Sequence, residues 1–453
     1  MTDAAPDWTR ELAELGARID YAAAPEEARE ATRHCLLDWL GVTWAGCREP
    51  LVAAMRRALR PEDAGREATL IGLPASSTSA PLAALINGAA GHALDFDDTH
   101  STMSGHPSVP VIPAALALAE ALGRNGEDLL TAILTGIEIE CRVGAIVNPG
   151  HYRAGFHATG TLGTFGAAAA CARLLDLDPE RWLHALGLAG TQAAGLKASF
   201  GTMAKPLHAG KAAHDGLLAA TLAAEGFTGN TCIVECRQGV ADAMHGSERD
   251  RHVLAEMADR WLVTETLFKY HAACYLTHST IEGALELRSR AGLDAGEVTA
   301  VEVFVPPTSL DVCNIGEPAT GLEGKFSLRA TAALALLGDD TAALGTYSDS
   351  RVGAGDLVRM RDAVRVRTSE GVSATATPIV VRTRDGRELE ACVDVGRPAT
   401  DLAAQRAKLE GKFLALTAPI LGADEAAALA ARALGAESLD SPAALLQPGP
   451  AEP

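Results

Sequence analysis

The sequence predicts a mostly helical protein, with a large helical domain and a smaller α/β domain inserted before the C-terminal helices. Two observations predict this class. Apolar residues make up 48% of the chain and aromatic residues only 4%, and the abundance of Ala, Leu and Gly favours closely packed helices over β-sandwiches. Apolar residues also recur every three or four positions over most of the first 265 residues.

The helical pattern begins at residue 9. Proline and glycine delimit its helices: Pro81, Pro113 and Pro206 lie near expected helix starts, where a missing N–H costs nothing, and Gly226 follows an expected helix end. The expected helices cover residues 26–40, 81–94, 110–122, 127–146, 160–175, 179–194 and 206–225.

Strand signals begin after residue 266. Residues 298–305 (VTAVEVFV) are typical of a strand, and residues 376–395 are typical of a hairpin that turns at Asp385 and Gly386. Helical patterns at 325–337 and 355–362 separate these strands, and a final helical stretch follows at 400–436. The expected parts are a helical domain at 1–266, an α/β domain at 267–398, helices returning to the helical domain at 399–438, and a flexible tail at 439–453.

The charge balance excludes one large class of partners. The formal net charge is −19, and the sequence has no basic run that could follow a phosphate backbone. No segment reaches the roughly 20 apolar residues of a membrane span. The first residues are acidic where a signal peptide needs a basic start. We therefore expect a cytoplasmic protein that binds neither nucleic acid nor a membrane.

Nine cysteines are scattered along the chain without CxxC pairs, which argues against a disulfide framework or a zinc site. The signatures of nicotinamide, nucleotide, zinc-protease and esterase sites are missing from any workable context. We therefore expect neither a cofactor nor a metal.

Four segments concentrate polar side chains. In the first, residues 91–100 (GHALDFDDTH) place three carboxylates and two imidazoles at the end of an apolar helix, and His106 follows in a polar loop. We interpret Asp95 and His106 as functional. For three further residues, helix capping and chemistry are equally supported; these are Asp97, Asp98 and Ser108.

The second segment, residues 150–163, is a glycine-rich loop that runs into a helix. A helix N-terminus offers free N–H groups and the positive end of the helix dipole, which suits a carboxylate. His157 precedes this helix, and it is either a hydrogen-bond donor to a ligand or a structural cap.

The third segment, residues 200–214, places Lys205 directly before Pro206 at a helix start. The neighbours of Lys205 are Gly, Ala, Met and Leu, so we expect a partly buried lysine that binds an anion. His208 and Lys211 lie three residues apart on one helical face, and we interpret them as supporting or packing residues.

The fourth segment, residues 268–278, lies where the helical pattern gives way to the α/β pattern. Pockets form preferentially between domains, so we expect substrate-binding residues here. The candidates are Lys269, Cys274, Tyr275 and His278. Cys274 is either a nucleophile or, more commonly for cysteine, a buried inert thiol.

Two other interpretations of residues 95–99 (DFDDT) are weaker. The run resembles the acidic motif of class II terpene cyclases, but such a site needs many aromatic side chains to stabilise carbocations. The whole chain has five Trp, five Tyr and nine Phe. A divalent metal at the three aspartates lacks further oxygen ligands at a helpful spacing.

Taken in order, the four segments resemble the MmgE/PrpD family, which includes 2-methylcitrate dehydratases, cis-aconitate decarboxylases and an iminodisuccinate epimerase. The strongest stretches are HALDFDDT at 92–99 with GHPS at 105–108, GFH at 155–157 with TLG at 161–163, GTMAKPLHAG at 201–210, and residues 269–278. Four motifs in register make the resemblance specific, and it spans nearly the whole chain.

The resemblance implies a large helical domain, a smaller α/β lid domain, a homodimer and no required cofactor. It also implies that five residues line the pocket: Asp95, Thr99, His106, His157 and Lys205. One departure stands out. Where animal cis-aconitate decarboxylases have a histidine in the last motif, this chain has Cys274, and residues 151–163, 201–210 and 274–275 are more similar to the epimerase.

These observations lead us to expect a lyase, either a dehydratase or a decarboxylase, that acts on a small di- or tricarboxylic acid. Lys205 and the helix start after His157 would hold the carboxylates. His106 and Asp95 would exchange the proton, in roles left open, and Thr99 would orient one of them. The alternatives are an epimerase of a dicarboxylic acid on the same scaffold and a non-catalytic binding protein.

Overall fold

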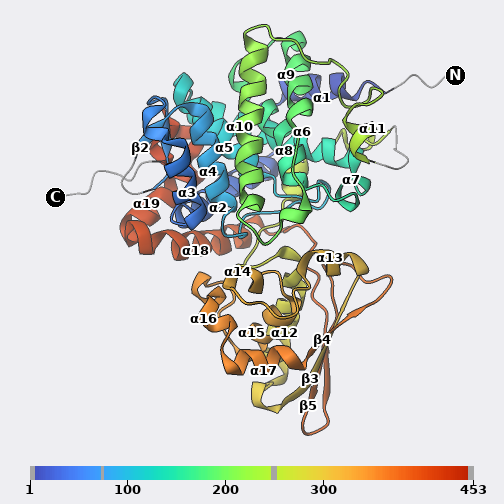
Figure 1. Cartoon of the computed structure of the whole chain (residues 1–453). Helices are drawn as coiled ribbons and strands as arrows, with labels where there is room; N and C mark the ends of the chain where they lie inside the picture. The colour runs from blue at the N-terminus through green and yellow to red at the C-terminus, as the bar shows by residue number, and fades with distance from the viewer. Residues whose placement is uncertain (1–5, 73–75, 246–251, 447–453) are drawn as a thin grey trace, which may run out of the picture. The chain divides into compact units, whose positions relative to one another are not determined.

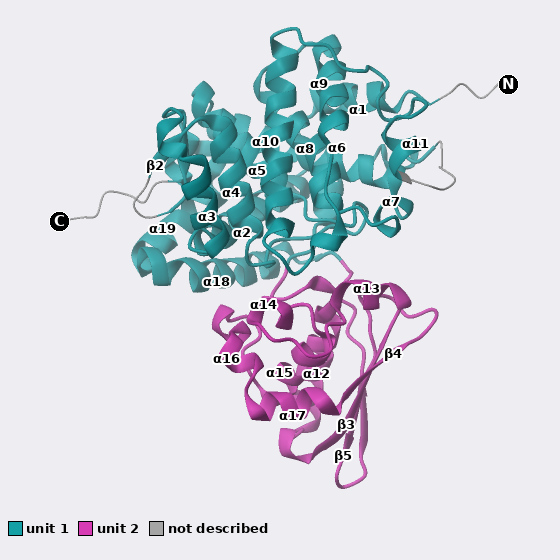
Figure 2. Ribbon diagram, viewed as in Figure 1, with its two compact units in different colours: residues 1–268, 398–453 teal, residues 269–397 magenta. Residues whose placement is uncertain are grey.

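The computed structural model describes residues 6–72, 76–245 and 252–446 (Figure 1). It divides into two compact units (Figure 2). Unit 1 combines residues 1–268 with residues 398–453, so the chain leaves this unit once and returns to it, and unit 2 contains residues 269–397. The prediction of a mostly helical chain whose C-terminal domain contains a small mixed sheet is confirmed.

Helices dominate unit 1. They are α1 (Trp8–Arg18), α2 (Glu26–Gly46), α3 (Pro50–Leu59), α4 (Ala80–His92), α5 (Ser108–Leu122), α6 (Gly126–Val147), α7 (Gly150–Arg153), α8 (Ala158–Leu174), α9 (Pro179–Gln192), α10 (Ala204–Ala224), α11 (Val240–His245), α18 (Leu402–Leu421) and α19 (Ala423–Leu434). Unit 1 also contains a two-stranded antiparallel sheet, β1 (Ala68–Leu70) with β2 (Ser76–Thr78). It was not predicted from the sequence, because each strand has only three residues.

Small residues let the central helices of unit 1 approach one another closely. A Cβ atom on Gly210 of α10 would lie 2.1 Å from the carbonyl oxygen of Leu85 in α4, and one on Gly216 would lie 2.7 Å from the carbonyl oxygen of Thr164 in α8. Only glycine fits at such distances. The backbones of α4, α8 and α10 therefore pack tightly with few aromatic residues, and the candidate site is built from the ends of these three helices.

Three sequence-based expectations for unit 1 are wrong. Pro113 lies inside α5, which begins at Ser108. The helical pattern does not extend to residue 265, because after Gly226 the chain forms turns and short 3₁₀ segments around α11. The first part of the expected flexible tail is folded, since Pro442–Leu445 forms a 3₁₀ turn with Leu445 buried, and residues 447–453 lie outside the described residues.

Unit 2 is a four-stranded sheet with helices on one face. Its helices are α12 (His278–Ala291), α13 (Leu310–Cys313), α14 (Gly321–Gly324), α15 (Leu328–Leu337), α16 (Asp349–Val352) and α17 (Gly355–Ala363). Its strands are β3 (Val298–Val305), β4 (Val364–Thr368), β5 (Ile379–Thr383) and β6 (Glu388–Ala391). The order is β4-β3-β5-β6; β4 was not predicted, and it pairs parallel to β3, whereas the other pairs are antiparallel.

The two faces of this sheet differ in chemistry. Val301, Val303 and Val305 of β3 are buried, as alternation predicts for a face covered by helices. The intervening Glu302 forms ion pairs with Arg367 and Arg382, 2.9 Å each. Within the described ranges, no helix of either unit is both long enough and apolar enough to cross a membrane.

Candidate active site

The loop between α4 and α5 carries most of the candidate site. α4 ends at His92, and Asp95 then adopts a left-handed backbone with φ of 52°, which Asp tolerates better than most residues. Lys412 of α18 holds this turn, because its Nζ donates to the Phe96 carbonyl oxygen at 2.7 Å and to Asp38 Oδ1 at 2.6 Å. A helix from the C-terminal part of the chain thus fixes the backbone beside Asp95.

Thr99 closes the same loop. Its backbone exchanges two hydrogen bonds of 2.8 Å with Leu267, and its hydroxyl donates to the carbonyl oxygen of Gly105 at 3.1 Å. The hydroxyl therefore holds the loop in shape, next to the residues that carry the charges.

His106 has its ring fixed by the residues that precede it. Its Nδ1 lies 2.6 Å from the carbonyl oxygen of Asp98 and 3.2 Å from Asp97 Oδ2. A carbonyl oxygen only accepts, so Nδ1 carries the proton and donates it. In the neutral ring the lone pair is therefore on Nε2, which faces Asp95 Oδ1 at 4.0 Å. That distance is too long for a hydrogen bond, so Asp95 leaves Nε2 free to react.

Lys205 and Asp95 form a buried ion pair. Lys205 lies in the first turn of α10, only 5% exposed, and its Nζ donates to Asp95 Oδ1 at 2.5 Å. The Phe200 ring lies 5.1 Å from the same ammonium. Removing two charges from water is costly unless they are paired. The structure therefore brings three predicted residues together at one carboxylate oxygen: Lys205, Asp95 and His106.

His157 immediately precedes α8 and joins the same cluster. Its side chain does not cap the helix; its Nδ1 instead lies 3.1 Å from His208 Nδ1. Burial, followed by the nearby His92 ring and the Lys205 ammonium, lowers the pKa of His157 well below its ordinary value, so the ring is neutral. His157 Nε2 is buried and has no hydrogen-bond partner within residues 6–72, 76–245 and 252–446. This nitrogen is available to a ligand.

His92 belongs to the cluster but was not among the predicted site residues. It is 1% exposed, its Nδ1 contacts both oxygens of Asp97 at 3.0 and 2.9 Å, and its ring centroid lies 4.7 Å from that of His106. Its position in the polar segment at 91–100 was the available signal. The other imidazole of that segment, His100, instead donates to the Leu262 carbonyl oxygen at 2.8 Å.

Asp97 and Asp98 have different roles. Burial alone would raise the pKa of Asp97, but the His92 and His106 rings hold it well below its ordinary value, so Asp97 is ionised between them. Asp98 accepts from the Ser108 backbone N–H at 3.3 Å and from its hydroxyl at 2.5 Å, at the start of α5. Burial, followed by the charge of Asp38, raises the pKa of Asp98 to about 8.

Two further residues of the third segment lie beside the cluster. His208 contacts His157, as described above, and burial lowers its pKa. Lys211 donates to the Gln192 carbonyl oxygen at 2.9 Å and pairs with Asp215. Lys211 therefore ties α10 to α9.

The candidates of the fourth segment lie in unit 2, where Lys269 is the first residue. Cys274 is buried at the start of a 3₁₀ turn, and the Tyr275 hydroxyl donates to the Val395 carbonyl oxygen. His278 begins α12, and its ring lies 5.0 Å from that of Tyr275. Burial raises the pKa of the Tyr275 hydroxyl, which therefore stays protonated. Their roles in substrate binding stay a prediction.

The cluster also contains groups that can bind a cation. A ring nitrogen from each of His92, His106 and His157 lies within 4.8 Å of the other two, and His92 and His106 form a similar group with Asp95 and Asp97. In the second group the carboxylates already have partners, because Lys205 donates to Asp95 and two imidazoles face Asp97. Among the residues that the structure describes, the three imidazoles therefore remain as the group that could hold a metal ion.

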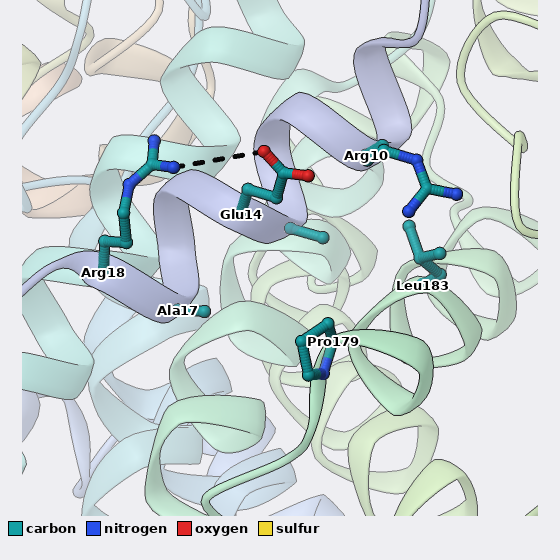
Figure 3. Close-up of a pocket in the computed structure, with 7 residues that line it drawn as sticks. Arg10, Glu14, Ala17, Arg18, Pro179 and Leu183 are labelled. Carbon is teal, nitrogen blue, oxygen red and sulfur yellow. Dashed lines mark ion pairs between the residues drawn. The ribbon is translucent and has the colours of Figure 1, made fainter.

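A shallow pocket elsewhere in unit 1 lacks comparable chemistry. It lies between α1 and α9 and is lined by Arg10, Ala13, Glu14, Ala17, Arg18, Pro179 and Leu183 (Figure 3). Its charged residues are exposed, and its one ion pair, Arg18 with Glu14, has a separation of 4.0 Å. Exposed pairs of this kind are weak because solvent screens both charges.

Unit 1 thus buries a lysine, carboxylates and several imidazoles together. Such a cluster is a candidate acid–base site. The chain belongs to the MmgE/PrpD family: the N-terminal domain of the family matches residues 10–252, and its C-terminal domain matches residues 271–436. This confirms the resemblance inferred from the four segments.

Two curated relatives are both named cis-aconitate decarboxylase. The human cis-aconitate decarboxylase is 29% identical over 68% of this chain and 66% of its own length. The cis-aconitate decarboxylase of Aspergillus terreus is 29% identical over 62% of this chain and 60% of its own length. The chain thus spans less than two thirds of the length of the curated relatives it matches.

Proposed function

We propose that this protein is a cofactor-independent lyase that removes water or carbon dioxide from a small di- or tricarboxylic acid. The observation that carries the proposal is the meeting of Lys205, His106 and Asp95 within 4.0 Å in the buried part of unit 1. The family membership and the relatives named as decarboxylases of a tricarboxylic acid support it.

Substrate carboxylates bind to the cationic side of the cluster in this proposal. The Lys205 ammonium supplies a full positive charge, and the N-terminus of α8, beside His157, supplies the positive end of a helix dipole. An incoming carboxylate competes with Asp95 for the ammonium. Asp95 then becomes a second proton acceptor near the substrate.

His106 is the group that moves the proton. With Nδ1–H held by the Asp98 carbonyl oxygen, Nε2 has the lone pair. In a dehydration, Nε2 takes the proton from the carbon next to a carboxylate, and the hydroxyl on the neighbouring carbon leaves as water after receiving a proton from the imidazolium. In a decarboxylation, Nε2 first takes a proton from water; the C–C bond then breaks, carbon dioxide leaves, and the electron pair left on carbon takes that proton from the imidazolium. Both reactions need the same proton carrier.

Product analysis tests the proposal. The purified chain is incubated in D₂O with citrate, cis-aconitate, malate and aspartate, and the mixtures are followed by NMR. We expect loss of water or carbon dioxide from one of these acids. Deuterium entering the α-carbon without loss of either group would contradict the lyase and support the epimerase, whereas no change in any acid would contradict both.

A further inference from the structure

A turn between α10 and α11 carries two cysteine side chains that the proposed reaction does not use. Cys232 is exposed, Cys236 is half-buried, and both are free thiols. The backbone N–H of Cys236 donates to the carbonyl oxygen of Cys232 at 2.9 Å, so the chain completes one turn between them. Side chains four residues apart on such a turn lie on the same side. The fold thus brings two thiols together at the surface of unit 1.

The side chain of Asn230 contacts both thiols. The backbone N–H of Cys232 donates to Asn230 Oδ1 at 3.0 Å, and because an N–H only donates, this bond fixes which way the amide group points. Cys232 Sγ donates to the same Oδ1 at 3.1 Å, and Asn230 Nδ2 donates to Cys236 Sγ at 3.6 Å. The two thiols also contact each other. One amide group therefore holds the two sulfur atoms side by side.

The surrounding backbone fixes the position of this turn without making it part of a helix. The backbone N–H groups of Val240 and Ala241 donate to the carbonyl oxygens of Ile233 and Val234 at 2.8 and 3.0 Å, so the segment folds back on itself. Residues 231–239 form turns and bends. A disulfide needs the sulfur atoms to approach to about 2.0 Å. An irregular turn can tighten in this way more easily than a regular helix, whose ladder of hydrogen bonds fixes its radius.

The charges near the pair are negative. Partial desolvation and the adjacent Cys236, followed by the carboxylates of Glu235 and Asp7, raise the pKa of the Cys232 thiol, which stays protonated near pH 7. Cys236 instead accepts a hydrogen bond from an amide N–H, which favours a thiolate. Negative surroundings repel anionic reagents, so a neutral reagent suits this pair best.

We infer that Cys232 and Cys236 form a thiol–disulfide exchange site, which closes into a reversible disulfide when it meets a small neutral disulfide. This inference is independent of the proposed function. Glu235 lies between the two cysteines, and its Oε2 accepts from the backbone N–H and the hydroxyl of Thr9 at 3.0 and 2.6 Å. The disulfide therefore closes the same turn that holds the start of α1.

The exchange takes two steps. The Cys236 thiolate attacks one sulfur of the small disulfide, whose S–S bond breaks, and the released thiolate takes a proton from water. Cys232 then gives its proton to solvent and attacks Cys236 Sγ, which breaks the mixed disulfide and releases the second small thiol. The two cysteines lose two electrons and two protons in total, and the small disulfide gains them. Because the thiols are already adjacent, the second step is at least ~10-fold faster than the first.

Peptide mass mapping of the full chain after treatment with 2-hydroxyethyl disulfide and an acid quench tests the inference. We expect a link between Cys232 and Cys236, with the loss of two hydrogen atoms and no added group, and we expect dithiothreitol to reverse it. In Cys232→Ser the second step is blocked, so Cys236 keeps a mercaptoethanol group. Cys392→Ser is the matched control, because Cys392 is an exposed cysteine of unit 2, and the link should form in it at the wild-type rate.

Three results would overturn the inference. The first is a mercaptoethanol group on each of the two cysteines without a link between them, and the second is a link from either of them to another cysteine. The third is Cys232→Ser in which Cys236 takes up no group, since Cys236 would then not be the attacking thiol. Each of these results leaves the proposed function standing.

Discussion

The two units use charged residues in opposite ways. In unit 1 the ion pairs near the site are buried: Lys205 with Asp95, and Lys412 with Asp38, have side chains at most 6% exposed. In unit 2 a pair beside the end of the sheet is open to solvent; the side chains of Arg387 and Glu297 are 40% and 48% exposed. A buried pair is sensitive to the loss of either partner, whereas an exposed pair contributes little. The buried pairs of unit 1 should therefore matter more for stability than the exposed pair of unit 2.

Breaking a buried pair should have the largest effect. In Lys412→Met, Asp38 loses its ammonium partner and the Phe96 carbonyl oxygen loses a donor. We expect the free energy of unfolding to fall by about 3–5 kcal/mol. Denaturant titration of the full chain measures it. Adding Asp38→Asn should restore part of the loss, and a double variant no more stable than Lys412→Met would contradict the pairing.

The next effect concerns the pH dependence of stability. The pKa of Asp98 is about 8 in the folded chain, against 3.8 ordinarily. Between these values the folded state holds a proton that the unfolded state has lost, so this residue makes stability fall as pH rises from 4 to 8. We expect the stability of wild type relative to Asp98→Asn to decrease over that interval, measured by unfolding at pH 5, 6.5 and 8. Parallel curves would show that Asp98 is ionised when folded.

The smallest effect is expected on the sheet of unit 2. Glu297→Gln removes the 2.8 Å pair with Arg387, whose guanidinium also contacts Asp385 at 2.7 Å. We expect a change in the free energy of unfolding below about 1 kcal/mol, further reduced in 0.5 M salt. A loss as large as that in Lys412→Met would remove the contrast between the two units.

Local patterns in the sequence predicted much of this molecule. Apolar spacing located the main helices, and alternation located β3, because both depend on neighbouring residues. The polar segment after α4 was recognised from the density of polar groups at the end of that helix. β4 was missed because its five residues include two arginines and their parallel partner lies on a distant strand.

The contacts that give each polar residue its role could not be predicted. Lys412 donates to the Phe96 carbonyl oxygen, which lies 316 positions away in the sequence. The residues around Lys412 in the sequence give no sign of this contact. Asp97 and Asp98 are adjacent and chemically identical. Only the fold shows that one lies between two imidazoles while the other meets Ser108 at the start of α5.

The central claim is that His106 moves the proton, and turnover of His106→Ala tests it most directly. With the substrate found by product analysis, we expect kcat to fall at least ~100-fold, with circular dichroism and the unfolding midpoint unchanged. His214→Ala, on α10 outside the cluster, should keep its activity. Turnover of His106→Ala close to that of wild type would contradict the account.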